Sequence, residues 1–261
     1  MAKQTTLTNQ FDLTGRVALI TGGSKGLGKA IARGFVEAGA DVVISSRSEE
    51  TLKSALEEIL AGTERRGIYV VADMSKRDDT LQLAQTALKQ MGKVDILVNN
   101  AGSNVPEPID KVTDENWDHL LELNLSSCMV LTRELVPQMK ERGWGRIIHM
   151  SSVLGLGGKD ARNTYATTKA GLIGLTRASA MDLGPHGITV NSLAPGPFMT
   201  DLPMTVLSEE DKQKFSRRMA LGRWGDPREI VGPALLLASE AGSFITGTAL
   251  VVDGGVLAHT L

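Results

Sequence analysis

"RVALITGGSKGLGKAIARGF", residues 16–35, contains an apolar run, a glycine-rich turn and a helical pattern in immediate succession. Residues 16–23 are typical of a buried strand, and the strand ends in glycines. The apolar residues that follow recur close to the helical period: Leu27, Ile31, Phe35 and Ala38. This stretch therefore predicts a strand, a tight turn and a helix that packs back onto the strand.

The same alternation of apolar runs and amphipathic stretches continues along the chain. Strands are expected at 16–23, 41–46, 68–75, 94–102, 145–152, 188–196 and 248–255, and helices at about 27–40, 48–61, 77–91, 114–142, 163–183 and 226–240. The strands are almost continuously apolar, which is typical of parallel strands covered on both faces. The pattern predicts an α/β fold, a Rossmann-type doubly wound, seven-stranded parallel sheet with helices on both faces.

No linker or repeat divides the chain, so residues 1–261 are expected to form a single domain. The least regular segment, about 197–225, is rich in methionine and lies between the sixth strand and a helix. Ligands bind at the carboxyl ends of the strands in open α/β sheets. We therefore expect this segment to be a lid-like insertion over a site, with a surface connection as the alternative.

Composition excludes several classes of function. The net charge is −2 and no dense block of Lys and Arg occurs, so no nucleic-acid partner is expected. The N-terminus lacks the apolar core of a signal peptide, and no apolar run approaches the roughly 18 residues of a membrane span. A cytoplasmic location is expected. The single cysteine, Cys128, is expected to be a small buried residue, and the scattered histidines give no metal site.

The glycine turn, "TGGSKGLG" (21–28), predicts a phosphate-binding site. Gly22, Gly26 and Gly28 carry no side chain where the backbone would approach a pyrophosphate. The N-terminus of the following helix offers free N–H groups and a positive dipole end. A turn of this kind without a ligand is the alternative, but the strand before it and the helix after it are the context that the motif requires.

The end of the second strand, "ISSRSEE", indicates the type of cofactor. A ribose 2′-hydroxyl is held by Asp or Glu, whereas a 2′-phosphate requires cations. Ser46 stands where an acid would, Arg47 follows it, and Lys25 of the glycine turn can reach the same place. NADP(H) is therefore favoured, and NAD(H) remains possible. Glu49 and Glu50 count against this interpretation, and solvated surface charges are the alternative.

Tyr165 and Lys169 share one helical face because they are four residues apart. A free phenol titrates near pH 10, and a neighbouring ammonium favours the phenolate. Ser152 closes the fifth strand and can hold a substrate oxygen. Together the three residues predict a proton donor, its tuner and an oxyanion holder for hydride transfer to a ketone, without a metal.

The chain resembles the short-chain dehydrogenase/reductase family over nearly its whole length. The segments that carry the resemblance are "TGGSKGLG", "ADMS", "NNAG", "NLSS", "MSSV", "YATTK", "NSLAPGPFMT" and "VVDGG". The resemblance implies that Asn124 completes a catalytic tetrad with Ser152, Tyr165 and Lys169, and that its helix holds a water that links Lys169 to solvent. It also implies that Asn99–Gly102 stabilise the sheet and line the adenine-ribose side.

The resemblance extends the set of cofactor contacts. It places Asp73 and Met74 at the adenine, Tyr165 and Lys169 at the nicotinamide ribose, and Pro195, Gly196 and Thr200 beside the nicotinamide. The full set expected to bind the cofactor is Gly22, Ser24, Lys25, Gly26, Leu27, Gly28, Ser46, Arg47, Asp73, Met74, Asn100, Ala101, Gly102, Tyr165, Lys169, Pro195, Gly196 and Thr200.

The family resemblance also implies a homotetramer. The helices at about 114–142 and 163–183 would form one interface, and the last helix and strand with the tail "VLAHTL" would form another. Packing of these helices within a monomer is the alternative.

The substrate is the least determined part of the function. Segments 103–110 and 153–163 are expected to contact it, and Lys159 and Arg162 would meet an anion or be solvated. Two subfamilies look similar: sugar and sugar-acid dehydrogenases such as gluconate 5-dehydrogenase, and 3-oxoacyl-carrier-protein reductase of fatty-acid synthesis. The latter requires a basic patch, for which Arg133, Lys140 and Arg142 are available. A generic ketone reductase and a non-catalytic nucleotide-binding sensor are further alternatives.

Overall fold

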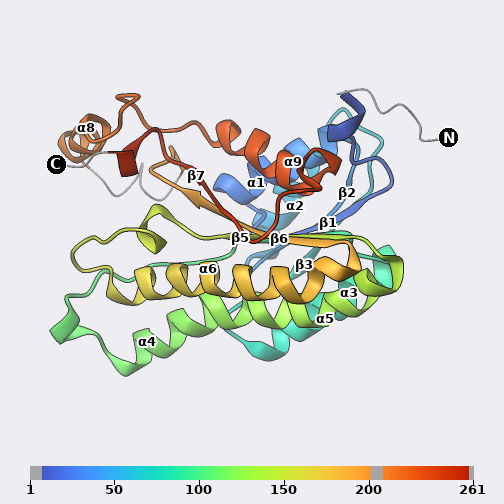
Figure 1. The fold of residues 1–261 in the computed structure, drawn as a ribbon, viewed down its shortest axis with the longest axis horizontal. Helices are drawn as coiled ribbons and strands as arrows, with labels where there is room; N and C mark the ends of the chain where they lie inside the picture. Colours follow the sequence, from blue (N-terminus) through green and yellow to red (C-terminus); the bar gives the residue numbers. More distant parts are fainter. Residues whose placement is uncertain (1–7, 201–207, 259–261) are drawn as a thin grey trace.

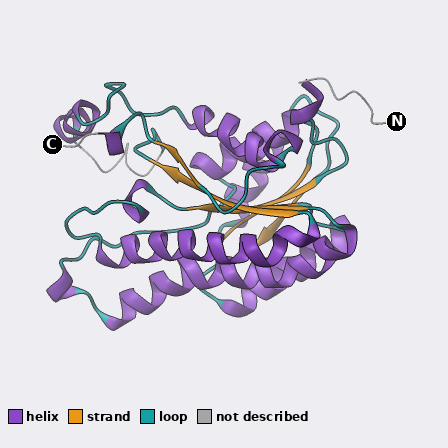
Figure 2. Ribbon diagram, in the orientation of Figure 1, coloured by secondary structure: helices purple, strands orange, loops and turns teal. Residues whose placement is uncertain are grey.

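The fold is described from a computed structural model, in which residues 8–200 and 208–258 are described. Seven parallel strands form one sheet in the order β3-β2-β1-β4-β5-β6-β7 (Figures 1 and 2). The strands are β1 (Val17–Thr21), β2 (Asp41–Ser46), β3 (Gly67–Val71), β4 (Ile96–Asn99), β5 (Gly145–Met150), β6 (Ile188–Pro195) and β7 (Ala249–Val252). The predicted α/β fold with a doubly wound parallel sheet of seven strands is confirmed.

Helices cover both faces of the sheet (Figure 1). One layer consists of α1 (Gly26–Glu37), α2 (Glu49–Leu60) and α9 (Val231–Ala238). The other contains α3 (Arg77–Met91), α4 (Asp114–Leu121), α5 (Ser127–Arg142) and α6 (Asn163–Leu183). A further helix, α8 (Glu209–Arg217), lies beyond the sheet near the C-terminal tail. None of the helices in the described ranges is both long and apolar enough to cross a membrane.

The two layers bury two separate cores, and alternate residues of the central strands belong to different ones. In β1, Ala18 and Ile20 pack with Phe35 of α1, whereas Val17 and Leu19 pack on the opposite face. Both sets are almost completely buried. A side-chain period of two with helices on both faces explains why the strands are apolar without alternation.

The order of the strands reverses at β1, whose neighbours are β2 and β4. The connections after β1 and β4 therefore leave the sheet in opposite directions and open a crevice at the carboxyl edge. This crevice is where the predicted motifs converge, because the glycine turn follows β1 and the segment "NNAG" begins within β4.

Several boundaries differ from the sequence prediction: β1, β3, β4 and β7 are shorter than expected, and α1 ends at Glu37 rather than near residue 40. Three further differences lie near the predicted site residues or in the long helices. Strand β5 ends at Met150 rather than at 152, so Ser152 lies just beyond it in extended backbone at the start of a short 3-10 turn, η4 (Val153–Gly155). The helix expected at 114–142 is α4 and α5, joined by a π-helical turn, Glu122–Ser126. The helix expected at 226–240 begins as a 3-10 turn, η6 (Pro227–Ile230), and continues as α9.

Candidate active site

The glycine turn lies against the loop that follows β4. Gly22 and Gly26 have positive φ angles of 64° and 56°, which favour glycine. A Cβ at Gly28 would lie 2.4 Å from both the carbonyl oxygen of Gly22 and Nδ2 of Asn100. Only glycine allows the first turn of α1 to pack this tightly, and the turn thereby approaches Asn100.

Hydrogen bonds fix the two loops of the crevice to each other. Thr21 Oγ1 accepts from the backbone N–H groups of Asn100 and Ala101 at 3.0 and 2.9 Å. The Asn100 amide donates in turn to the carbonyl oxygens of Thr21 and Gly22. The start of α1 has no side-chain cap, so its N–H groups point into the crevice without a side-chain acceptor. Such a helix N-terminus is suited to a phosphate.

The end of β2 carries the residues predicted to select the cofactor. Arg47 is exposed and Ser46 is half-buried, with its Oγ buried and without a hydrogen-bond partner in the described structure. Glu49, which counted against a phosphate, is occupied: it pairs with Lys53 at 3.0 Å and accepts from the Tyr69 hydroxyl at 3.0 Å. Within the described ranges, neither Arg47 nor Lys25 forms an ion pair.

Asp73 follows β3 and faces Arg47 across the end of the sheet. Burial raises the pKa of Asp73, but hydrogen bonds from Ser75 and the charges of Arg47 and Lys76 outweigh it, so the pKa lies below its ordinary value. Met74 beside it is buried. Of the two residues expected at the adenine, Asp73 therefore lies near Arg47, whereas Met74 packs into the core under the sheet.

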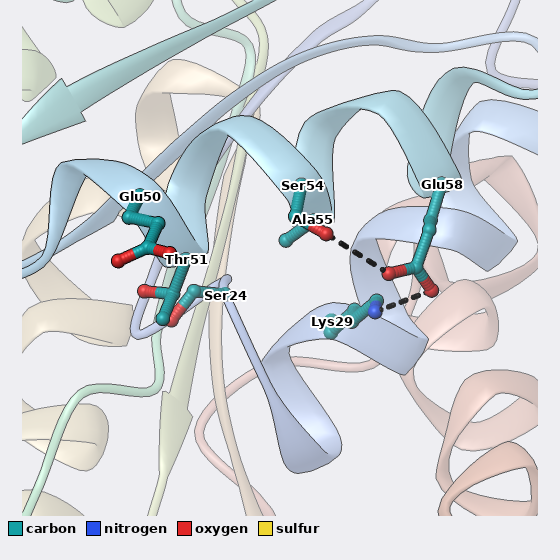
Figure 3. Close-up of a pocket in the computed structure, with 7 residues that line it drawn as sticks. All are labelled: Ser24, Lys29, Glu50, Thr51, Ser54, Ala55 and Glu58. Atoms are coloured by element: carbon teal, nitrogen blue, oxygen red, sulfur yellow. Dashed lines mark hydrogen bonds and ion pairs between the residues drawn. The ribbon is translucent and has the colours of Figure 1, made fainter.

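A hollow of about 420 Å³ lies between the glycine turn, α1 and α2. Ser24 lies beside Thr51, and Lys29 pairs with Glu58 at 2.6 Å across the hollow (Figure 3). The rest of the lining is Glu50, Ser54 and Ala55. No residue of the predicted catalytic tetrad lines this hollow, and of the residues expected to bind the cofactor only Ser24 does.

Tyr165 and Lys169 lie one turn apart on α6, as predicted. Lys169 is buried, and its Nζ lies 5.5 Å from the centroid of the Tyr165 ring. The Nζ donates to the carbonyl oxygen of Met150 at 2.7 Å, which ties α6 to the end of β5. A Cβ at Gly102 would lie 3.4 Å from the same Nζ, so the loop after β4 also reaches it.

Ser152 lies at the start of η4, the turn that packs against α6. The Ser152 hydroxyl accepts from the backbone N–H of Leu154 at 3.1 Å, which leaves its own proton available for a ligand. The neighbouring Ser151 donates to the carbonyl oxygen of Lys169 at 2.7 Å. This second serine holds η4 against α6, a role that the sequence did not indicate.

Asn124 lies in the π-helical turn and connects three parts of the site. The side chain is fully buried, accepts from the N–H of Ser103 and donates to the carbonyl oxygen of Ser103, both at 2.9 Å. The amide also donates to Thr168 Oγ1 at 3.2 Å, beside Lys169. The backbone carbonyl of Asn124 accepts from the thiol of Cys128. Single π turns are frequent at functional sites.

Cys128 is 3% exposed, and burial raises the pKa of its thiol to about 11. The prediction of a small buried residue is therefore confirmed.

The strand-six segment closes the crevice from the other side. A Cβ at Gly196 would lie 2.7 Å from that of Asp253, so glycine is required there. Thr200 lies over the glycine turn, because a Cβ at Gly26 would be 3.3 Å from its Cγ2. Pro195 ends β6. Part of the expected lid, residues 201–207, lies outside the described residues.

Fold and site together define a dinucleotide-dependent oxidoreductase. The family model described as Enoyl-(Acyl carrier protein) reductase matches residues 22–257. The 3-oxoacyl-acyl-carrier-protein reductase of Aquifex aeolicus is 36% identical over 95% of this chain and 99% of its own. The 2-dehydro-3-deoxy-D-gluconate 5-dehydrogenase of Dickeya dadantii is 37% identical over 97% and 100%.

The fold is also similar to that of a solved structure. The gluconate 5-dehydrogenase of Burkholderia cenocepacia, in complex with NADP and tartrate, aligns with a TM-score of 0.91, 34% identity and coverage of 97% of this chain and 99% of that one. The chain belongs to the short-chain dehydrogenase/reductase family, whose members are NAD(P)-dependent oxidoreductases that act on CH–OH groups.

Proposed function

We propose that this protein is an NADP(H)-preferring enzyme that interconverts a ketone and a secondary alcohol on a sugar acid. The observation that carries the proposal is the convergence of Tyr165, Lys169, Ser152 and Asn124 beside an uncapped glycine turn. Lys169 is hydrogen-bonded to Met150, and Asn124 is hydrogen-bonded to Ser103. The side chains of Lys169 and Asn124 are therefore held in position before a substrate binds. Preorganised donors of this kind stabilise the charge that develops on a reacting oxygen.

The crevice fits a dinucleotide on the evidence of its own geometry. The uncapped start of α1 suits the pyrophosphate, and the glycines of 22–28 allow its close approach. Arg47, Lys25 and the unpartnered hydroxyl of Ser46 suit a 2′-phosphate. Asp73, Met74 and Asn100–Gly102 would border the adenosine, and Pro195, Gly196 and Thr200 the nicotinamide. The bound cofactor would supply or accept the hydride.

The side chains would handle the proton. In the reductive direction, Tyr165 donates its proton to the substrate oxygen, and Ser152 donates a hydrogen bond to the same oxygen. The Lys169 ammonium would supply a positive charge beside Tyr165 and would bind the nicotinamide ribose. Asn124, in the π-helical turn, would help to hold a water that connects Lys169 to solvent. Residues 197–225, with α8, would act as the lid.

A Tyr165→Phe variant tests the proposal. It removes the transferable proton and leaves the ring, so turnover should fall about 10²- to 10⁴-fold while NADPH affinity is retained. The assay is NADPH oxidation against a keto-gluconate, an acetoacetyl thioester and an aromatic ketone, with NADH in parallel. Tyr69→Phe is the matched control, because Tyr69 is the only other tyrosine in the sequence. Tyr69 lies on β3, and its hydroxyl donates to Glu49 of α2. Unchanged turnover in Tyr165→Phe would contradict the role of Tyr165 as the proton donor. Tight NADPH binding by the wild type without reduction of any of the three ketones would favour a nucleotide-binding sensor with a vestigial site.

Reduction of a 3-oxoacyl group on a carrier protein is the second candidate function, favoured by the relatives that carry this name. It requires cations that are free to meet an acidic carrier. Arg133 pairs with Glu134 at 3.0 Å, and Arg142 bonds Gln138 and the buried Asp95. Two of the three cations of the predicted patch are thus already engaged, which supports the sugar-acid proposal over the carrier-protein one.

A further inference from the structure

Three cations from three segments gather near the candidate active site. Lys159 lies in the loop after η4, Arg162 immediately precedes α6, and Arg218 immediately follows α8. The charges that act on Lys159 are those of Arg162 and Arg218, opposed by Asp160 and Asp211. None of the three cations forms an ion pair with any residue in the described ranges. We call Lys159, Arg162 and Arg218 the cationic rim.

The cationic rim is electrostatically unfavourable in the absence of an anion. Burial and the charges of Arg162 and Arg218 lower the pKa of Lys159, although the two carboxylates oppose this effect. Like charges that lie this close together repel each other, and the two carboxylates offset only part of that repulsion. A bound carboxylate would relieve the repulsion, and guanidinium groups are well shaped to bind one.

Two residues of the rim lie in the segment that joins two of the proposed catalytic residues. Lys159 and Arg162 belong to the segment that joins Ser152 to Tyr165, and Arg162 is three residues before Tyr165. A β-bridge between Glu107 and Arg162 fixes this segment to the 103–110 loop. Ala161 has a φ of 54°, the only positive value outside glycine in the described residues, and a non-glycine residue adopts this conformation only at a cost in free energy. Strain of this kind persists where the surrounding structure requires one conformation.

Aromatic packing on α8 supports the part of the rim that contains Lys159 and Arg218. Lys159 Nζ lies 4.4 Å from the centroid of the Phe215 ring on α8. Phe215 packs edge-on against Trp224 at 5.5 Å, and the Trp224 indole donates to the carbonyl oxygen of Lys212 at 3.0 Å. Phe215 and Arg218 also line a hollow of about 450 Å³ together with Asp211, Lys214 and Arg217. The ammonium is therefore held over a fixed aromatic face beside open space.

We propose that the cationic rim binds the carboxylate of the substrate and makes the enzyme specific for hydroxy and keto acids over neutral ketones. This inference rests on the proposed function and assigns its substrate class to named residues. Lys159 would provide the central charge, and Arg162 and Arg218 would complete the site from α6 and α8. None of these residues takes part in proton transfer.

The test compares two substrates in the full-length protein. 5-Keto-D-gluconate and L-sorbose share the ketone and its neighbouring hydroxyls but carry a carboxylate or a hydroxymethyl group at the far end. Lys159→Gln and Arg218→Gln should each raise the KM for the keto acid about 10- to 100-fold, the effect of losing a charge-assisted hydrogen bond. The kcat should change little, and the KM for L-sorbose should stay the same. Lys159→Arg should restore most of the affinity.

Lys214→Gln is the matched control, because Lys214 lies on the same helix and pairs with Glu210 at 2.9 Å. It should leave both KM values unchanged. Equal use of the two substrates by the wild type, or equal losses for both in Lys159→Gln, would overturn the inference. Reduction of the aromatic ketone alone would also overturn it while leaving the reductase function intact.

A binding experiment separates the two proposals if no ketone is reduced. Calorimetric titration of the NADP⁺ complex with sodium D-gluconate, and with uncharged D-glucitol, measures the affinity of the rim for a carboxylate without requiring turnover. Gluconate binding that is lost in Lys159→Gln, with no glucitol binding, would support the rim even though the proposed reaction fails. Gluconate binding that is absent, or that is unaffected by Lys159→Gln, would contradict the rim.

Discussion

Arg47 is the residue on which the coenzyme preference depends. It is exposed at the end of β2, faces Asp73 and forms no ion pair with a described residue. The nearest carboxylate along the chain that would compete for it, Glu49, is bound to Lys53 and Tyr69. A free guanidinium beside the half-buried Ser46 is what a 2′-phosphate would require.

Replacement of Arg47 by Gln should therefore raise the KM for NADPH about 10- to 100-fold, because one charge-assisted contact is lost. The KM for NADH should change little. Steady-state kinetics with both coenzymes measures the difference, and Lys89→Gln, an exposed cation on α3, controls for net charge. A similar loss with both coenzymes would exclude a 2′-phosphate contact at Arg47.

At the scale of the elements, the β4–β5 pair contains a polar pair that the mechanism does not use. Asn99 and His149 lie opposite each other in register, and the Asn99 amide and His149 Nδ1 lie 3.1 Å apart. His149 is fully buried and its Nε2 has no partner in the described structure. Burial, followed by the charge of Lys169, lowers the pKa of His149 from 6.5 to about 4. The imidazole is therefore neutral in the folded protein.

The depressed pKa predicts an acid-sensitive stability. The unfolded chain takes up a proton on His149 near pH 6.5, whereas the folded chain does so only near pH 4. Stability from this group is complete above about pH 6.5 and is lost as the pH falls toward 4. Between pH 7 and pH 5 the loss should be about 2 kcal/mol.

Urea unfolding at the two pH values, at one protein concentration, measures this difference. His149→Gln should reduce the difference by about 2 kcal/mol, whatever its effect at pH 7. His186→Gln, which changes an exposed histidine, should keep it. An unaltered pH dependence in His149→Gln would show that the buried imidazole does not control acid stability.

At the scale of the whole molecule, apolar side chains are exposed on the elements expected to form subunit interfaces. Phe244, between α9 and the edge strand β7, is fully exposed, and Met181 on α6 is 79% exposed. Val251 on β7 is 39% exposed. A subunit interface would remove these side chains from water, and burial of apolar surface drives association. We propose that these faces pair in a homotetramer.

Native mass spectrometry should then give about four times the chain mass of 27.8 kDa. Phe244→Lys places a charge in the interface at the β7 edge and should reduce the assembly to dimers. The same substitution at Val71, 49% exposed on the opposite edge strand β3, should leave the tetramer intact. A wild-type monomer at micromolar concentration would contradict the proposal.

Most of the fold was predictable because its causes are local. Apolar runs separated by helical patterns predicted all seven strands, and the glycine turn predicted the first crossover. The boundaries were less accurate where tertiary contacts override local preference. Ser152 leaves β5 because Ser151 bonds the carbonyl oxygen of Lys169, and the π turn at Asn124 forms where its amide reaches Ser103 and Thr168.

The sequence by itself determined the doubly wound sheet, the family and the placement of Tyr165 one helical turn before Lys169, because short-range periodicity and spacing encode them. Only the tertiary structure decided which distant groups meet. In the folded chain Arg142 pairs with Asp95, and Glu49 pairs with Lys53. Lys159 lies over the Phe215 ring and near Arg218. Charges interact through space rather than along the chain, so their partners follow from how the loops at the carboxyl edge of the sheet fold together.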